Sequence, residues 1–264
     1  MSASPASAGR VSPGLRRTLY RVAALTGVAG VVRALTAGRG VSFFIYHDPA
    51  PDALDRHLSW LGQRYTFVSI GEACDALEAG VVGRLGRWPA VLTLDDGRRG
   101  NAGLVDVLRR HGVRPCLYLC SGLVGSSRPY WDDEVVRRAP ARLDDLKRRT
   151  EAERRRALSS ELAFTYEDEA RAPAALSRAD LAALAPHVDF GSHGRFHQPL
   201  RFLSGPECQK EITVSKREIE ALVGRPCEHF ALPSGAYDQA VLGAVAAAGY
   251  RSCRTAQPYA NGEP

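Results

Sequence analysis

Two adjacent carboxylates, Asp95 and Asp96, follow the apolar residues 91–94 and precede Gly97. A buried strand that ends in Asp-Asp-Gly places charged groups at the carboxyl edge of a sheet, where α/β folds bind their ligands. Side chains alternate along a strand, so one carboxylate can hold a metal while the other handles protons. The alternative is an ordinary turn, because Asp-Gly is common turn chemistry. This stretch alone favours neither interpretation.

Two histidines, His193 and His197, follow a second predicted strand over residues 188–192. They converge on one point if the loop between them makes a single turn. One Asp and two His supply three nitrogen and oxygen ligands, which suits a divalent cation such as zinc with open positions for water. Each histidine alone would be read as a surface or capping residue. Two such motifs at strand ends on one predicted edge favour a shared site.

The elements that must position these residues alternate along the chain. Strands are predicted over residues 41–46, 67–70, 89–94, 113–120, 188–192, 227–232 and 250–253, and helices over 51–65, 71–79, 101–111, 177–184, 206–223 and 238–248. Alternation with short connections predicts a parallel sheet with helices outside. Residues at about 122–175, which include a charged helical stretch over 143–166, interrupt the alternation and are read as a helical excursion.

Composition bounds the class of protein. The chain has 264 residues, 45% hydrophobic and 24% charged, which predicts one soluble α/β domain over residues 41–264. The net charge is +6, but no nucleic-acid-binding signature accompanies it. The arginine runs at 148–149 and 154–156 are interpreted as a solvated helical face. Six scattered cysteines suggest buried thiols in a reducing compartment, with neither a disulfide framework nor a zinc knuckle.

The first 40 residues are predicted to be separate from this domain. A Ser-, Ala-, Gly- and Pro-rich tail, predicted to be disordered, precedes the apolar run 22–32, which is too short to span a bilayer. We interpret the run as a basic amphipathic helix that covers the barrel or rests on a membrane surface. The expected location is therefore cytoplasmic or peripheral to a membrane. A signal peptide, and with it export, is the alternative.

Five segments of the chain resemble motifs of one known family. They are Tyr46-His47, Thr93-Leu94-Asp95-Asp96-Gly97, Trp131-Asp132-Asp133-Glu134, His193-Gly194-Arg195-Phe196-His197 and Phe230-Ala231-Leu232-Pro233-Ser234-Gly235-Ala236-Tyr237. In that order they are similar to Tyr-His, Thr-Phe-Asp-Asp-Gly, Trp-Asp-Glu, His-Ser/Thr-x-x-His and Phe-Ala-Tyr-Pro-Tyr-Gly-x-Tyr of the polysaccharide deacetylase family. This is carbohydrate esterase family four, the NodB homology domain. The resemblance runs from about Val41 to the C-terminus.

The resemblance implies a distorted (β/α) barrel of about seven parallel strands that removes N-acetyl groups from an N-acetylated carbohydrate. It assigns Asp96, His193 and His197 as ligands of a divalent metal, zinc by preference with cobalt or nickel as alternatives. Asp95 becomes the general base. The physics agrees, because a metal activates water and polarises the acetyl carbonyl, while a carboxylate beside it accepts the water's proton.

Several positions depart from the family's motifs. Ala231 stands where many members carry an arginine that orients the base, Ser234 replaces a tyrosine, and Gly194 replaces a Ser or Thr. The late Leu-His motif that supplies the general acid in many members has no match. His47 is the remaining histidine at a strand end, and we interpret it as the acid or as a hydrogen-bonding residue. Ser234 occupies the position whose backbone N–H faces the oxyanion in the family.

Trp131 is read as a substrate-binding residue that stacks on a sugar ring or, equally, as an anchor of the excursion. Two further functions stay open. The departures from the motifs fit a catalytically impaired metal- or carbohydrate-binding relative. The lack of a carbohydrate-binding appendage fits a small-molecule deacylase of a biosynthetic pathway. The sequence predicts no oligomeric state.

Overall fold

Strands and helices alternate along residues 40–255, the part of the chain that the computed structural model describes. The strands are β1 (Ser42–Tyr46), β2 (Thr66–Phe67), β3 (Pro89–Leu94), β4 (Cys116–Leu119), β5 (Asp189–Ser192), β6 (His229–Ala231) and β7 (Ser252–Arg254). The helices that follow strands are α3 (Pro51–Gly62), α4 (Ile70–Glu78), α5 (Val105–His111), α9 (Arg178–Leu184), α10 (Gly205–Val223) and α11 (Gln239–Ala247).

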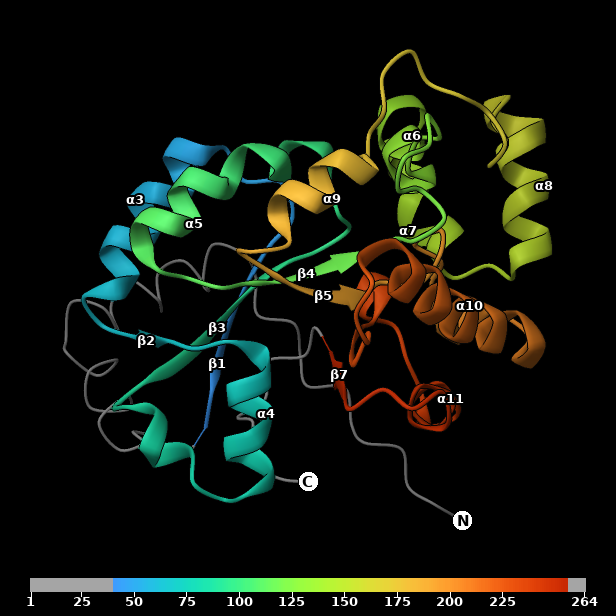
Figure 1. Ribbon diagram of the computed structural model, residues 1–264. Coiled ribbons are helices and arrows are strands. Elements are labelled where there is room, and N and C mark those ends of the chain that lie inside the picture. The colour runs from blue at the N-terminus through green and yellow to red at the C-terminus, as the bar shows by residue number, and fades with distance from the viewer. Residues whose placement is uncertain (1–39, 256–264) are drawn as a thin grey trace, which may run out of the picture.

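The strands form one parallel sheet in the order β1-β3-β4-β5-β6-β7, with β2 paired to the start of β3. Each helix carries the chain back to the same end of the sheet, so the carboxyl ends of the strands meet at one edge. Within residues 40–255 no pairing joins β7 to β1, and the sheet is curled but open (Figure 1). The predicted distorted barrel of about seven parallel strands is confirmed.

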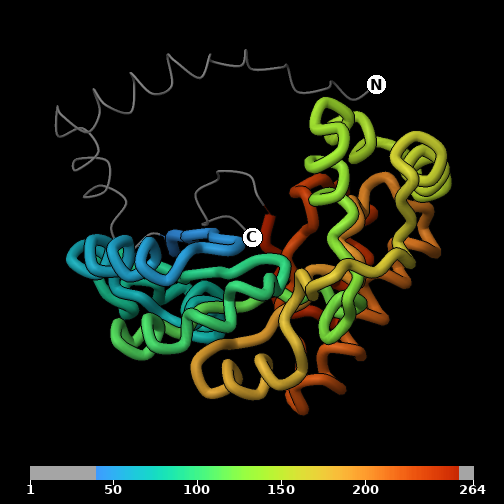
Figure 2. The backbone as a smooth tube through the Cα atoms, turned by 90° about the horizontal axis from the view of Figure 1, so that it is seen from above, coloured from blue at the N-terminus to red at the C-terminus, as the bar shows by residue number. Residues whose placement is uncertain are grey.

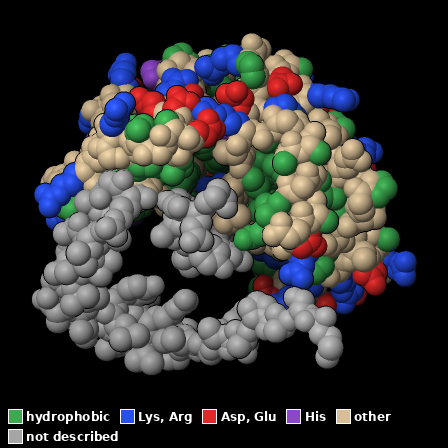
Figure 3. All heavy atoms as spheres, turned by 90° about the horizontal axis from the view of Figure 1, so that it is seen from below, with side chains coloured by type: hydrophobic (Ala, Val, Ile, Leu, Met, Phe, Trp, Pro, Cys, Tyr) green, Lys and Arg blue, Asp and Glu red, His purple; other side chains and the backbone are tan. Residues whose placement is uncertain are grey.

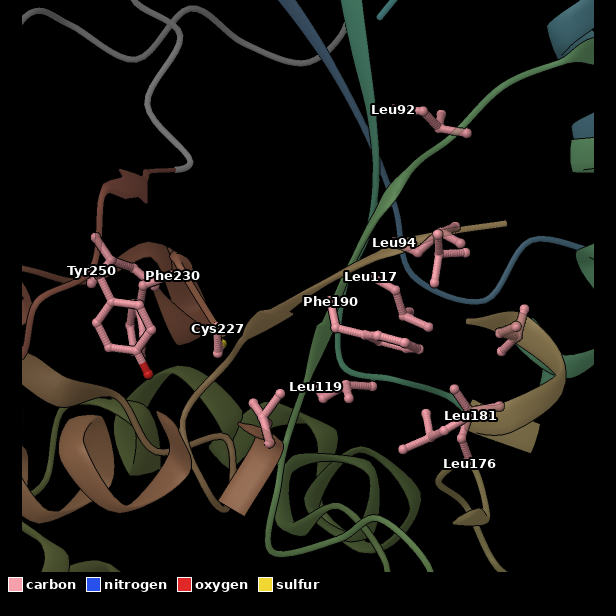
Figure 4. Close-up of a cluster of buried hydrophobic side chains, with 14 of the residues drawn as sticks. Leu92, Leu94, Leu117, Leu119, Leu176, Leu181, Phe190, Cys227, Phe230 and Tyr250 are labelled. Carbon is pink, nitrogen blue, oxygen red and sulfur yellow. The ribbon is translucent and has the colours of Figure 1, made fainter. Parts of the chain in front are cut away.

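The core lies between this sheet and its helices. All six residues of β3 are buried, as expected of a parallel strand covered on both faces. Leu92, Leu94, Leu117, Phe190 and Leu181 of α9 belong to one buried cluster, and Figure 4 shows Leu94, Leu117 and Phe190 on the side of the sheet that faces Leu181. Each such side chain contributes about 1.5–3 kcal/mol when it leaves water. This packing holds the strand ends, and thus the functional side chains, in fixed positions.

Local signals set several helix ends. Ser69 and Glu72 form a capping box at the start of α4, and Ser177 and Asp180 form one at the start of α9. Gly112 ends α5 in the left-handed conformation. The helix predicted over residues 101–111 instead begins with the 3-10 turn Arg99–Leu104. Two glycines in that turn disfavour a regular α-helix.

The interruption at residues 122–175 contains three helices, α6 (Trp131–Arg138), α7 (Leu143–Lys147) and α8 (Glu151–Leu162). Figures 1 and 2 both place them at the end of the molecule that carries α10, away from α3. They enclose a small core of their own around Trp131, Leu158 and Phe164. We refer to α6, α7 and α8 with their connections as the excursion.

One arginine of the predicted solvated face is buried, which corrects that interpretation. Arg154 has no exposed surface. Its guanidinium donates to Tyr166 Oη at 3.0 Å and to the Arg149 carbonyl at 3.0 Å, and also contacts the Gln198 side chain. It also lies 5.1 Å from the centre of the Trp131 ring. This network ties the excursion to the loop after β5.

The predicted N-terminal tail, amphipathic helix and membrane contact fall in residues 1–39, outside the described residues. Among the helices of residues 40–255, none combines the length and apolarity needed to cross a membrane. On the face drawn in Figure 3, Lys and Arg side chains are interspersed with Asp and Glu. That arrangement matches the mixed charge pattern of the sequence.

Candidate metal centre and active site

The structure brings Asp96, His193 and His197 together at the carboxyl ends of β3 and β5. Nε2 of His193 lies 3.4 Å from Oδ1 of Asp96, and Nε2 of His197 lies 3.6 Å from the same oxygen. The three possible ligand atoms all lie within 4.8 Å of one another. All three side chains are buried. Residues nearly a hundred positions apart therefore face a common point.

The cluster fits a divalent cation. Ligands at ~2.0–2.1 Å in a tetrahedron lie ~3.3–3.4 Å apart, close to the separations between Asp96 and the two histidines. Oδ1 of Asp96 is buried without a hydrogen-bond partner among the described residues. A buried carboxylate oxygen left without a partner is costly, and a cation would satisfy it. Two imidazoles and one carboxylate are a ligand set that suits zinc.

The other ring nitrogen of each histidine has its own contact. Nδ1 of His193 lies 2.8 Å from the carbonyl oxygen of Ala231, so it donates a proton there and leaves Nε2 free to bind a cation. Nδ1 of His197 lies 3.0 Å from Oδ2 of Asp132. Sequence reasoning missed Asp132 in this role, although the Trp-Asp-Glu resemblance contained it.

Charges around the cluster shift two ionisation equilibria. Burial would raise the pKa of Asp96, but the neighbouring histidine and arginine side chains outweigh burial and hold it far below its ordinary value. Burial opposes charge on His197, but Asp132 and Asp96 outweigh burial and raise its pKa from 6.5 to about 9. A cation at Nε2 requires the neutral ring. The proton and the cation therefore compete for His197.

Asp95 is not part of the Asp96, His193 and His197 cluster and has a different partner. Its side chain is buried, and Oδ2 accepts a hydrogen bond from the Arg254 guanidinium. Oδ1 has no hydrogen-bond partner among the described residues. Asp96 instead accepts from Nε of Arg98 at 2.8 Å. Each carboxylate thus has its own arginine, and Asp95 keeps one oxygen free beside the cluster.

Arg254 corrects the inference drawn from Ala231. Ala231 on β6 pairs in register with Arg254 on β7, so an arginine stands one strand further along the sheet. The Arg254 side chain is 9% exposed, reaches Asp95, and lies over the Tyr118 ring with its guanidinium carbon 5.3 Å from the ring centre. The contact could not be predicted from the family resemblance, because Arg254 belongs to none of the motifs.

Backbone strain is concentrated at this edge. Among the described residues, four other than glycine have positive φ, and three of them are Asp96 (73°), His197 (55°) and Ser234 (57°). Each costs about 1–2 kcal/mol for an L-residue. Such conformations persist where the surrounding structure imposes them, and they cluster at functional sites. The positive φ angles therefore indicate that these strand ends form a functional site and are not ordinary turns.

Gly194 does not leave its loop unsupported. Oε2 of Glu211 on α10 accepts the N–H groups of Arg195 at 2.7 Å and Phe196 at 3.2 Å. Gly194 has φ of 74°, and a Cβ there would lie 3.1 Å from the same Glu211 oxygen. The carboxylate therefore occupies the space that a side chain at position 194 would need. Glu211 fixes the loop between the two histidines from a helix rather than from within the motif.

Trp131 anchors the excursion, and the alternative of stacking on a sugar ring is wrong. Its side chain is 1% exposed, so a sugar cannot reach the ring face. Nε1 donates to the carbonyl oxygen of His197 at 3.0 Å, while Oη of Tyr130 donates to the carbonyl oxygen of Asp96 at 2.9 Å. Residues at the start of α6 thus hold the backbones of both strained candidate ligands, Asp96 and His197. Asp132, next along α6, contacts His197 directly.

His47 follows β1 and Ser234 follows β6, two strands that are not adjacent in the sheet, and both residues are exposed. Tyr46 of β1 is paired in register with Leu94 of β3, which places His47 beside the strand that leads into Asp95. Its carbonyl oxygen accepts from Nδ2 of Asn101 at 2.9 Å. Within residues 40–255 the His47 side chain makes no hydrogen bond or ion pair. Ser234 follows β6 on the opposite side of the cluster.

Several solved structures share this fold. The structure of the Streptococcus pyogenes deacetylase PplD in complex with acetate is 16% identical to this chain in sequence. The match covers 80% of each chain, with a TM-score of 0.56. IcaB from Ammonifex degensii is 14% identical, with 80% of this chain and 82% of that chain covered and a TM-score of 0.57. The BpsB deacetylase domain from Bordetella bronchiseptica is 16% identical to this chain, with 85% of this chain and 91% of that chain covered and a TM-score of 0.59.

Those identities establish similarity of fold. No curated protein matches the chain in sequence. The family model described as polysaccharide deacetylase matches residues 84–253, which include both the Asp-Asp-Gly stretch and the two histidines. That match spans more than half of the chain. The chain therefore belongs to the polysaccharide deacetylase family and is a hydrolase of carbon–nitrogen bonds other than peptide bonds.

Proposed function

We propose that this chain removes the acetyl group from an N-acetylated sugar or polysaccharide with the help of a bound divalent metal, zinc by preference. The observation that carries the proposal is the buried convergence of Asp96, His193 and His197 beside the free oxygen of Asp95. The fit of those three residues to a tetrahedral cation supports it. The family match supports the class of substrate.

Each residue has a distinct part in the hydrolysis. A bound divalent cation supplies Lewis acidity, which polarises the acetyl carbonyl and acidifies water. Asp95 takes the proton of the water that attacks the carbonyl carbon, through Oδ1. Arg254 holds the other oxygen of Asp95 and so fixes the orientation of the base. The backbone N–H of Ser234 is our candidate donor to the oxyanion that forms. The carbon–nitrogen bond then breaks to give acetate and a free amine.

The first test is metal removal. Dialysis against a chelator should abolish deacetylation of N-acetylglucosamine oligomers, and zinc, cobalt or nickel should restore it. Released acetate is the measurement. Unchanged activity after the metal content falls to zero would contradict the proposal. Bound metal and bound oligomer with no product would favour the impaired relative, and faster turnover of the monomer than of oligomers would favour the small-molecule deacylase.

We propose His47 as the general acid that protonates the leaving nitrogen. His47→Gln should lower amide hydrolysis by about 10²–10⁴-fold, the usual contribution of a positioned acid. Hydrolysis of an activated acetyl ester should fall much less, because its leaving group needs no proton. The ratio of the two rates is the measurement. An equal loss on both substrates would remove His47 from this role and assign it to structure.

A further inference from the structure

A cavity of about 470 Å³ lies between the excursion and the loops that follow β5 and β6. One wall comes from the excursion, through Lys147 at the end of α7 and Arg148 directly after it. The facing wall comes from Pro199 and Arg201 in the loop after β5, and from Ser234 after β6. Its volume lies within the ~300–1,000 Å³ range of small-molecule sites.

Two of the lining residues join the cavity to the metal cluster. Pro199 lies two positions after His197 in the same loop. Ser234 lies three positions after Ala231, whose carbonyl oxygen accepts from His193. No residue of the cluster itself lines the cavity, but the two loops that carry Pro199 and Ser234 also lead to the cluster. The cavity is therefore a candidate for the part of a substrate that lies beyond the acetylated sugar.

The excursion pairs most of the arginines that lie away from this cavity. Arg142 and Arg149 both form ion pairs with Asp145. Arg154 and Arg155 both form ion pairs with Glu151. Carboxylates of α7 and α8 are thus available to the arginines of the excursion, and these four arginines use them.

The cations of the cavity wall differ from those arginines. Within residues 40–255, none of Lys147, Arg148 and Arg201 forms an ion pair. The Arg201 guanidinium carbon lies 5.9 Å from the centre of the Phe202 ring, its one recorded side-chain contact. Asp144 is the single carboxylate among the lining residues. Three cations and one anion leave the cavity with a surplus of positive charge.

We propose that this cavity binds an anionic group of the substrate, a carboxylate or a phosphate, beside the acetylated sugar. This inference rests on the proposed function, because it assigns the cavity to the same substrate. Guanidinium groups bind carboxylate and phosphate through paired N–H donors, and a lysine adds a compact charge. Neutral sugars present hydroxyl groups, whose binding does not require three cations without carboxylate partners. The substrate class is therefore an acidic N-acetylated saccharide.

Binding of sugars without an acetyl group tests the cavity apart from catalysis. Titration calorimetry with glucose, glucuronic acid and glucose 1-phosphate compares a neutral probe with a carboxylate and a phosphate. At least one acidic probe should bind about tenfold more tightly than glucose, the worth of one charged hydrogen bond. The preference should weaken as salt rises and should persist in metal-free protein. The tighter of the two acidic probes identifies the anionic group.

Two charge reversals of equal size provide the variant and its control. Arg201→Glu changes the cavity wall, while Arg156→Glu changes an exposed arginine of α8 that does not line the cavity. The first should abolish the preference for acidic probes, and the second should retain it. Equal affinity for all three probes, a preference lost with the metal, or the same loss in both variants would overturn the inference. None of these outcomes depends on whether the protein deacetylates.

Discussion

Replacing Asp95 by asparagine should lower kcat by about 10³-fold while the protein keeps its full complement of metal. A positioned general base contributes ~10²–10⁴-fold to such reactions. The substitution preserves the shape of the side chain but removes its ability to take a proton. Asp95 contacts Arg254 and not the histidine cluster, so metal binding should survive. Acetate release and metal content, measured on the same preparation, check both halves of the prediction.

The same substitution on the neighbouring residue is the matched control. Asp96→Asn should lose metal as well as activity, because Oδ1 of Asp96 faces both histidines. The two variants differ by one position in the chain and share the same chemical change. Metal lost from Asp95→Asn, or retained by Asp96→Asn, would reverse the roles that we assign to this pair.

The sheet and most of its helices could be predicted because their signals are local. The apolar residues of β3 and the capping pair Ser177 and Asp180 each act within a few positions of the chain. The convergence of the three candidate ligands could be predicted for a related reason. Asp96 and the two histidines end strands of one parallel sheet, and parallel strands deliver their carboxyl ends to a common edge.

The residues that support this cluster were harder to predict, because their contacts are tertiary. The residues next to Trp131 in the sequence do not show whether its ring is exposed to stack on a sugar or buried to anchor the excursion. The run of arginines around Arg154 predicts a solvent-exposed side chain, whereas the structure buries it. Ala157 and Leu158, three and four positions later, carried a usable signal, since they share its face of α8 and are buried with it.

The excursion therefore belongs to the site, although it interrupts the regular alternation of strands and helices. Trp131 and Asp132 contact His197, and Arg154 contacts the side chain of the following residue, Gln198. The excursion thus contacts the backbone and the ring of His197 and the side chain of the residue that follows it. A loop with a strained residue at its centre needs such support, because the strain otherwise relaxes.

Replacing Arg254 by methionine should lower kcat by about 10²-fold, the size of loss that follows a misplaced catalytic group. Methionine fills part of the same space but cannot hold the Asp95 carboxylate. Stability should fall as well, because the Asp95 and Arg254 side chains are only 5% and 9% exposed. Losing one partner of a buried ion pair costs about 3–5 kcal/mol. Metal content should be unchanged, and the melting temperature reports the loss of stability.

A second substitution separates orientation of the base from stability alone. Ala231 and Arg254 are register partners on adjacent strands, so an arginine can approach Asp95 from either position. The double variant Arg254→Ala with Ala231→Arg returns the arginine to the strand that carries it in many family members. Its kcat should exceed that of Arg254→Ala at least tenfold, which corresponds to about 1.4 kcal/mol of recovered transition-state stabilisation. Recovery of the melting temperature without recovery of kcat would show that Arg254 neutralises a buried charge and does not orient the base.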